Sequence, residues 1–160
     1  AKLLPNEAGW WCIDSLTGQV DFSKNGFESV RDENGTGHLW YVRDGQVDFS
    51  RNGAYVYPDH VIPAEKYCWL VGGQIDKTCS GVYYMNLDGI EGWYGFLEGQ
   101  QITYTLLPNP DDGSWWYVST NGQIDFSCTG IFRARDHYYH LAEDAWYVRN
   151  GQVDFSYTGI

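Results

Sequence analysis

Short runs of alternating apolar and polar residues, each broken by a glycine turn, recur along this chain. In the last of them, residues 145–156, two alternating runs flank the dipeptide Asn150-Gly151. Such a dipeptide favours a type I′ turn, because both of its residues tolerate a positive φ angle. Folding the chain at this turn pairs Val148 with Val153. The pattern therefore predicts a β-hairpin with one buried apolar face, made of Trp146, Val148, Val153 and Phe155.

The tetrapeptide Gly-Gln-Val/Ile-Asp marks five such hairpins. Successive copies lie at intervals in the range that is typical of repeat architectures. A degenerate sixth copy begins at Gly99, and there we expect Thr103 to replace the aspartate. The intact copies begin at Gly18, Gly45, Gly73, Gly122 and Gly151.

A third apolar run follows most hairpins after a second glycine turn, at residues 27–30, 54–57, 82–85 and 131–134. Each unit is thus expected to hold two or three strands, with little or no helix. A lone hairpin cannot bury its apolar face, so neighbouring units must stack. We predict an all-β fold of about six tandem hairpin repeats, stacked as a solenoid-like or curved repeat domain. The single domain covers residues 1–160, with units near 8–30, 38–57, 66–85, 92–106, 114–134 and 145–160.

Irregular segments rich in Asp, Glu, Gly, Pro, Tyr and His separate the units. A regular scaffold that carries irregular insertions is typical of binding proteins. The widest departure from the repeat spans residues 86–116. The insertions are residues 31–39, 58–66, 86–92, 107–114 and 135–144.

Composition narrows the classes of partner. The net charge is −11, which argues against nucleic acid and against an anionic membrane surface, because both require basic residues. No apolar run approaches the length of a membrane span. Aromatic residues make up 18% of the chain, a balance typical of β-rich surface proteins. The chain starts at Ala1, and its last repeat stops at Gly159-Ile160, so we expect a segment of a longer protein.

The four cysteines allow two interpretations. Two disulfides are possible, in three connectivities, and Cys68 with Cys79 is the best pair because both flank the Gly72-Gly73 turn. Alternatively, all four cysteines, which include Cys12 and Cys128, are small buried apolar residues without disulfides. The chain has no C-x-x-C pair, which argues against zinc.

Residues 146–159 (Trp-Tyr-Val-Arg-Asn-Gly-Gln-Val-Asp-Phe-Ser-Tyr-Thr-Gly) resemble a known repeat class. They look like the Trp-Tyr-Tyr-Val, Asn-Gly, Val-Asp-Phe/Tyr and Thr-Gly repeats of large surface proteins from gut Clostridia and related Firmicutes. Those repeats are similar to cell-wall-binding, choline-binding and glucan-binding repeats. The resemblance covers the six hairpin cores. It implies a binding module of a secreted or surface-anchored bacterial protein. The present units are longer than choline-binding repeats and carry Asp after Val.

Tyrosines on the polar hairpin face and in the insertions are the candidate recognition residues. Tyrosine offers a large, rigid contact area with a polar tip. The alternative is that they pack between repeats. Trp115, like Trp10, lies outside the regular register and is a further contact candidate. The candidate ligand-binding residues are Tyr41, Tyr55, Tyr57, Tyr83, Tyr84, Tyr94, Trp115, Tyr117, Tyr138, Tyr139 and Tyr147.

Two sets of repeated residues admit a structural and a functional interpretation. The repeated aspartates could coordinate a ligand or calcium, but hydrogen bonding to the following turn or the opposite tyrosine is favoured. The repeated tryptophans could stack on sugars, but their register with the valines favours the core. The aspartates are Asp21, Asp48, Asp76, Asp125 and Asp154. The tryptophans are Trp11, Trp40, Trp69, Trp93, Trp116 and Trp146.

Motifs for metal binding and catalysis are weak. His137 and His140 would point to opposite faces of a strand, so we predict no metal site there. No nucleophile elbow or phosphate loop is present, and we predict no cofactor. Two carboxylates that meet in space could still hydrolyse glycosides, which makes an enzyme the third hypothesis.

We therefore expect a non-catalytic binding module with one of two kinds of partner. The first is carbohydrate, in the cell wall or in a host glycan. The alternative is a host protein, such as an immunoglobulin or a mucin, bound through one non-repeating patch rich in tyrosine and acidic residues. Equivalent pockets should recur between repeats in the first case, and a single patch should serve in the second. Neither nucleic acid binding nor membrane insertion is expected.

Overall fold

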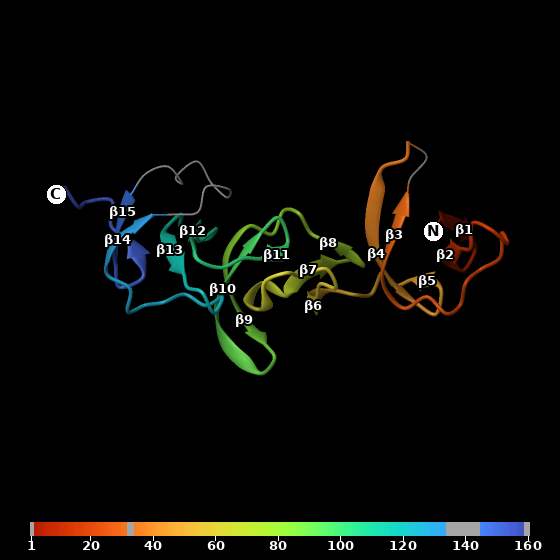
Figure 1. The fold of residues 1–160 in the computed structure, drawn as a ribbon, viewed down its shortest axis with the longest axis horizontal. Coiled ribbons are helices and arrows are strands. Elements are labelled where there is room, and N and C mark those ends of the chain that lie inside the picture. Colours follow the sequence, from red (N-terminus) through yellow and green to blue (C-terminus); the bar gives the residue numbers. More distant parts are fainter. Residues whose placement is uncertain (1, 32–33, 134–144, 159–160) are drawn as a thin grey trace. The chain divides into compact units, whose positions relative to one another are not determined.

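The computed structural model describes residues 2–31, 34–133 and 145–158. Antiparallel β-strands make up its regular structure, together with one short 3-10 helix, η1 (Pro63–Glu65), among these residues (Figure 1). The predicted all-β class is confirmed. Within the described part of the chain, no helix is long and apolar enough to cross a membrane.

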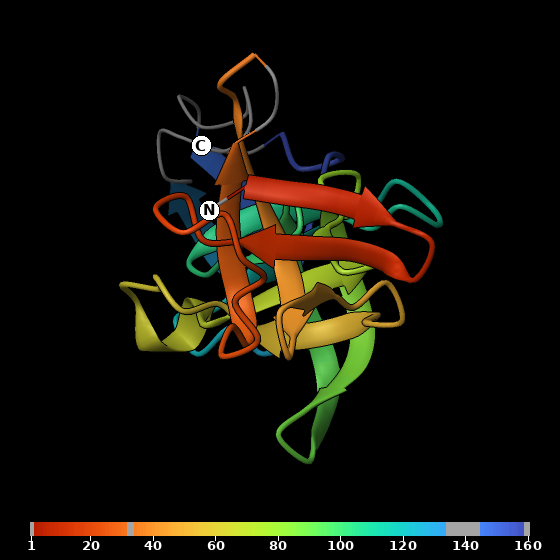
Figure 2. The same ribbon diagram turned by 90° about the vertical axis from the view of Figure 1, so that its right-hand side faces the viewer.

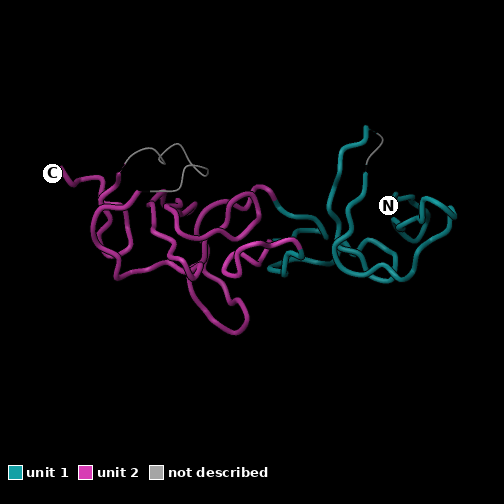
Figure 3. Tube along the Cα trace, in the orientation of Figure 1, with its two compact units in different colours: residues 1–58, 69–76 teal, residues 59–68, 77–160 magenta. Residues whose placement is uncertain are grey.

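The chain divides into two compact units (Figure 3). Unit 1 holds residues 1–58 and 69–76, and unit 2 holds residues 59–68 and 77–160. Strand β7 (Tyr67–Val71) contributes residues to both units.

Unit 1 is built from short hairpins that pair edge to edge. Strand β2 pairs with β1 on one side and with β5 on the other, and β4 pairs with β3, β5 and β8. Figure 2 shows β1 and β2 as the two red antiparallel arrows. The strands are β1 (Lys2–Asn6), β2 (Gly9–Ile13), β3 (Gly26–Arg31), β4 (Gly37–Arg43), β5 (Gln46–Val47), β6 (Gly53–Val56) and β8 (Gln74–Ile75).

Unit 2 contains a long hairpin and a five-stranded sheet. The hairpin of β9 and β10 extends away from the neighbouring strands of its unit (green in Figure 1). The five-stranded sheet has the order β12-β13-β16-β15-β14. The strands are β9 (Gly81–Leu87), β10 (Ile90–Leu97), β11 (Gln100–Gln101), β12 (Thr105–Pro108), β13 (Trp115–Val118), β14 (Gly130–Arg133), β15 (Ala145–Arg149) and β16 (Gln152–Val153).

The predicted hairpin register is confirmed. Val148 pairs with Val153 across the Asn150-Gly151 turn, and Val42 pairs with Val47 in the second copy. The third apolar runs also form strands, namely β3, β6, β9 and β14. All four pair with the first strand of the following hairpin, namely β3 with β4, β6 with β7, β9 with β10, and β14 with β15. Three of the predicted insertions include strand residues. Residues 86–92 form the strand ends and turn of the β9–β10 hairpin, residues 37–39 belong to β4, and residues 107–108 belong to β12.

Fewer side chains are buried in each hairpin core than the alternation predicts. Val42 and Val148 are fully buried, whereas Phe49 and Phe155 are 49% and 59% exposed. The prediction that these phenylalanines are buried is therefore wrong. The physical reason is that the strand ends two residues before each phenylalanine, which therefore lies in the turn after the aspartate. Each phenylalanine instead lies edge-on against the half-buried tryptophan of its own hairpin, with ring centroids 5.6 Å apart.

The repeated aspartates form the turns that follow the hairpins, as predicted. The Oδ1 atom of Asp48 accepts hydrogen bonds from the amide of Ser50 at 3.1 Å and from its hydroxyl at 2.5 Å. The Ser50 hydroxyl holds the pKa of Asp48 below its ordinary value of 3.8. Asp21, Asp125 and Asp154 make the same two bonds to the serine two residues later.

Each such turn also holds the tip of the next hairpin. The carbonyl of Lys24 accepts from the amide of Gly45 at 2.9 Å, and Oδ1 of Asn25 accepts from the amide of Asp44 at 3.0 Å. A Cβ on Gly45 would lie 2.5 Å from the Asp21 carbonyl oxygen, so glycine is required there. The same two contacts join residues 51–52 to 72–73, 79–80 to 98–99, and 128–129 to 150–151.

The degenerate copy that begins at Gly99 is the fourth along the chain. It departs from the repeat differently from our prediction. The amide of Ile102 donates to the carbonyl of Gly95 at 3.0 Å, as the aspartate amide does in other copies. Ile102 therefore occupies the aspartate position, and the assignment of Thr103 is wrong. A carboxylate from η1 serves instead, because Oε1 of Glu65 accepts from the amide and hydroxyl of Thr103 at 2.8 and 2.7 Å.

All four cysteines lie in the described part of the chain and are thiols. The predicted Cys68–Cys79 disulfide is therefore wrong in this structure. Cys68 is fully buried and Cys79 is 8% exposed. Burial raises the pKa of Cys68 to about 12, so its thiol stays protonated at neutral pH. The structure supports the packing interpretation of these residues.

Candidate ligand-binding site

Unit 2 contains a pocket of about 150 Å³ whose lining is mainly apolar, with three aromatic side chains. It is formed by side chains of β9, β10 and β13 and of the segments that follow β12 and β13. The lining residues are Val82, Trp93, Asn109, Trp116, Ile124 and Phe126.

The β9–β10 hairpin supplies one wall. Tyr84 pairs with Trp93 and Val82 pairs with Gly95, so these residues share one face of the hairpin. Gly95 leaves room for the fifth hairpin, because a Cβ there would lie 2.7 Å from Cδ1 of Leu107 and 2.8 Å from Cγ2 of Val118. A glycine within a strand thus allows the two hairpins to approach closely.

The fifth hairpin supplies the opposite wall. Trp116 and Phe126 meet edge-to-face, with centroids 5.6 Å apart, and Phe126 is 54% exposed. Nε1 of Trp116 donates to Oγ of Ser114 at 2.7 Å, and that hydroxyl donates to Oδ1 of Asp112 at 2.6 Å. The Ser114 hydroxyl lowers the pKa of Asp112, which therefore stays ionised and fixes the orientation of the indole.

Asn109 is the polar residue of the pocket lining, and it is 9% exposed. Its backbone amide donates to the Ser114 carbonyl at 2.6 Å, and its Oδ1 accepts from the amide of Asp111 at 2.9 Å. The first bond fixes the backbone of Asn109, and the second fixes its side chain with the amide oxygen toward Asp111. The Nδ2 group of Asn109 is therefore the donor that a ligand could use.

The pocket floor belongs to a hydrophobic core. Val82 and Ile124 pack with Ile102, Leu107 and Val118, all of them at most 8% exposed. Among the described residues, no lysine or arginine lines the pocket. The nearby carboxylates of Asp112 and Asp125 remain ionised because serine hydroxyls lower their pKa values. Aromatic faces with one amide donor suit a ligand that has apolar faces and hydroxyl groups.

The predicted recognition residues of unit 1 gather in another place. Tyr41 lies 5.4 Å from both Phe27 and Tyr55, and Phe27 also contacts Tyr57. Arg51 lies over the rings of Tyr41 and Tyr55, at 5.0 and 5.7 Å from their centroids. This cluster contains its own cation and is an internal packing contact.

Several predicted recognition residues of unit 2 pack inside the unit. Tyr94 is 5% exposed and donates to the Ile90 carbonyl, so its predicted place on an exposed polar face is wrong. Tyr83 donates to the Ser80 carbonyl at 3.0 Å. Trp115 packs with Tyr117 against the core that contains Phe132.

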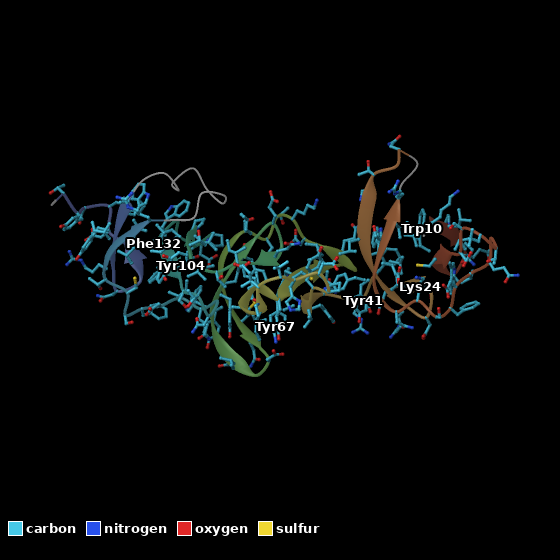
Figure 4. The ribbon with its side chains drawn as sticks, viewed as in Figure 1. Trp10, Lys24, Tyr41, Tyr67, Tyr104 and Phe132 are labelled. Atoms are coloured by element: carbon cyan, nitrogen blue, oxygen red, sulfur yellow. The ribbon has the colours of Figure 1, made fainter. Side chains whose placement is uncertain are left out.

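The remaining candidates are more exposed or fall outside the described residues. The rings of Tyr104 and Phe132 lie 5.4 Å apart (Figure 4), and Tyr117 contacts both. Tyr147 stacks on Tyr157 at 4.0 Å. Tyr84 is 59% exposed. Tyr138, Tyr139, His137 and His140 lie outside the described residues.

Sequence reasoning assigned the main pocket residues to the core or did not single them out. Trp93 and Trp116 were expected to pack with the valines, and Asn109 was not singled out. The sequence does hold one signal for Trp93. Trp93 lies one residue farther from the glycine of its hairpin tip, Gly99, than Trp40 lies from Gly45.

Neither protein-family models nor curated proteins yield a match to this chain. Among the described residues, no group of three or more His, Cys, Asp and Glu side chains could hold a metal ion. The pocket and the repeated hairpins are therefore the features of the chain that bear on its function.

Proposed function

We propose that this chain is a non-catalytic carbohydrate-binding module of a secreted or surface-anchored bacterial protein. Its ligand is a glycan of the cell wall or of the host. The observation that carries the proposal is the pocket between Trp93, Trp116 and Phe126, with Asn109 beside them. Sugar rings carry apolar C–H faces and equatorial hydroxyls, and such a lining complements both.

We also propose that the hairpins form a tandem repeat array. Support comes from the four equivalent contacts in which a turn holds the tip of the next hairpin. The array explains why one copy can diverge to make a pocket. The third turn still holds the tip of that copy, and the fifth turn still holds the tip of the sixth hairpin.

A matched pair of phenylalanine variants tests the carbohydrate proposal. Phe126 lines the pocket, whereas Phe49 makes the same edge-on contact with its tryptophan in unit 1 and is similarly exposed. Binding to purified cell-wall polysaccharide and to a glycan array should be lost in Phe126→Ala and kept in Phe49→Ala. Equal loss in both variants, or no glycan binding by the wild type, would reject the proposal.

Recognition of a host protein is the second candidate. The β9–β10 hairpin favours it, because Tyr84 and Ile90 are each 59% exposed on a long element that has no equal elsewhere in the described chain. Acidic Asp88 and Glu91 lie beside them. Immobilised immunoglobulin and mucin should then capture the wild type but not a Tyr84→Ala/Ile90→Ala variant. Capture of deglycosylated mucin would favour this candidate over carbohydrate binding.

A further inference from the structure

We propose that Tyr84 provides a second sugar subsite beside the pocket, so that the ligand is an uncharged oligosaccharide longer than one ring. This inference rests on the carbohydrate-binding function proposed above. It adds a specificity-determining residue and a chemical class of ligand.

The aromatic surface continues beyond the pocket through Tyr84. Tyr84 lies directly opposite Trp93 in the β9–β10 register, and their rings meet edge-to-face with centroids 5.7 Å apart. Trp93 is a wall of the pocket, whose far side is formed by Trp116 and Phe126. The aromatic side chains therefore form a series that starts at exposed Tyr84 and continues through Trp93 to the far wall of the pocket.

The Tyr84 ring is oriented for contact with solvent and ligand. Its hydroxyl donates to Oε2 of Glu91 at 3.3 Å, and the charge of Glu91 raises the pKa of Tyr84. The phenol thus remains a neutral hydrogen-bonding group at physiological pH. The neighbouring tyrosines differ, because Tyr83 and Tyr94 donate to backbone carbonyls of their own unit.

The hairpin that carries Tyr84 is fixed at its far end. Nζ of Lys66 contacts Oδ2 of Asp88 at 2.8 Å, and the amide of Gly89 donates to Oδ1 of Asn86 at 2.9 Å. A preorganised aromatic side chain loses little conformational entropy when a ligand binds. The position of Tyr84 relative to Trp93 is therefore set before binding.

The charges around this surface disfavour an acidic sugar. Glu91 lies beside Tyr84, and Asp112 lies behind Trp116 through Ser114. Lys66, which lies between η1 and β7 and reaches the hairpin, is already in contact with Asp88. A carboxylate or phosphate on the ligand would meet negative charge, and the described residues that line the pocket include no cation to compensate it.

Calorimetric titration with sugars of increasing length tests the inference. The probes are N-acetylglucosamine and its β-linked dimer and tetramer, maltose oligomers of the same lengths, and a hyaluronan tetrasaccharide as the acidic probe. A neutral tetramer should bind more tightly than its monomer, and the acidic probe should bind more weakly. Tyr84→Ala should weaken tetramer binding by about 2- to 10-fold and leave monomer binding unchanged.

Ile131→Ala is the matched control, because Ile131 is an exposed apolar residue on β14 of the same unit and does not line the pocket. It should bind every probe like the wild type. If Tyr84→Ala binds the tetramer normally while Phe126→Ala fails, the subsite is rejected and the proposed function stands. Tighter binding of the acidic probe overturns the charge argument. If the wild type binds none of the sugars, the proposed function fails and the subsite with it.

Discussion

Replacing the glycine at a hairpin tip tests whether tips are held by the preceding turn. We choose Gly45, whose φ angle is +77° and whose hypothetical Cβ would lie 2.5 Å from the Asp21 carbonyl oxygen and 3.1 Å from Cα of Phe22. Both neighbours are backbone, so neither can move aside without displacing the turn. The change Gly45→Ala therefore combines backbone strain with a steric clash.

The magnitude follows from separating these two effects. Holding alanine at a positive φ angle costs about 1–2 kcal/mol. Forcing an extra methyl group into a packed contact adds about 1–3 kcal/mol. Gly18 isolates the first effect, because its φ angle is +72° and nothing lies within 4 Å of its hypothetical Cβ. We expect Gly45→Ala to cost about 2–5 kcal/mol and Gly18→Ala about 1–2 kcal/mol.

Urea denaturation and hydrogen exchange would measure the difference. The amide of Cys12 donates to the carbonyl of Gly45 at 2.8 Å, which makes its exchange rate a local reporter of tip docking. It should accelerate strongly in Gly45→Ala and little in Gly18→Ala. Equal destabilisation by the two variants, with unchanged exchange at Cys12, would refute the docking argument.

Three further outcomes are expected. Trp146 is half-buried, so Trp146→Ala should lower the free energy of unfolding by about 2 kcal/mol in urea, and a loss as large as that of a fully buried tryptophan would contradict the structure. The pKa of Asp48 is lowered by Ser50, so this contact stabilises the fold above the ordinary pKa of 3.8 and is lost as the pH falls through the lower folded value. Ser50→Ala should therefore move acid unfolding, followed by circular dichroism, to higher pH, and an unchanged midpoint would contradict this. Burial raises the pKa of Cys68 to about 12, so iodoacetamide should label half-exposed Cys128 first in the native protein, whereas equal labelling by mass spectrometry would contradict it.

Local rules predicted the hairpins well. The Asn150-Gly151 turn, the pairing of Val148 with Val153, and the aspartate-serine turns all depend on residues close in sequence. Turn chemistry and strand alternation act over a few residues, so they can be recognised without knowledge of the rest of the fold.

The burial of the repeat aromatics could not be predicted in the same way. Phe49 alternates with Val47 as a core residue would, but the strand ends at Val47 and the chain turns outward. The alternation continues in the sequence after the strand has ended. Similarly, the contact of Glu65 with Thr103 joins an insertion to a distant hairpin, and nothing local marks that pairing.

The pocket arises where the tryptophan slips by one residue. In the second copy Trp40 pairs with the glutamine after the next hairpin tip, whereas in the fourth copy Tyr94 pairs with the equivalent Gln123. Because successive strand residues face opposite sides, this slip buries Tyr94 and turns Trp93 toward the pocket. The third copy shows the opposite slip, since Cys68 takes the tryptophan position there. Trp69 is then in the tyrosine register, contrary to the predicted alignment.

The same fourth copy also lacks the tyrosine that the second, fifth and sixth copies have at the next position of the register (Tyr41, Tyr117 and Tyr147). Gly95 stands there, and its lack of a side chain allows Leu107 and Val118 to pack directly on β10. A tyrosine at this position would keep the fifth hairpin away from Trp93 and separate the two walls of the pocket. The slipped tryptophan and the glycine are thus both needed, since the first supplies an aromatic wall and the second brings Trp116 and Phe126 to face it. A repeat that followed the consensus would have neither, and this is a physical reason to place the binding site at the divergent copy.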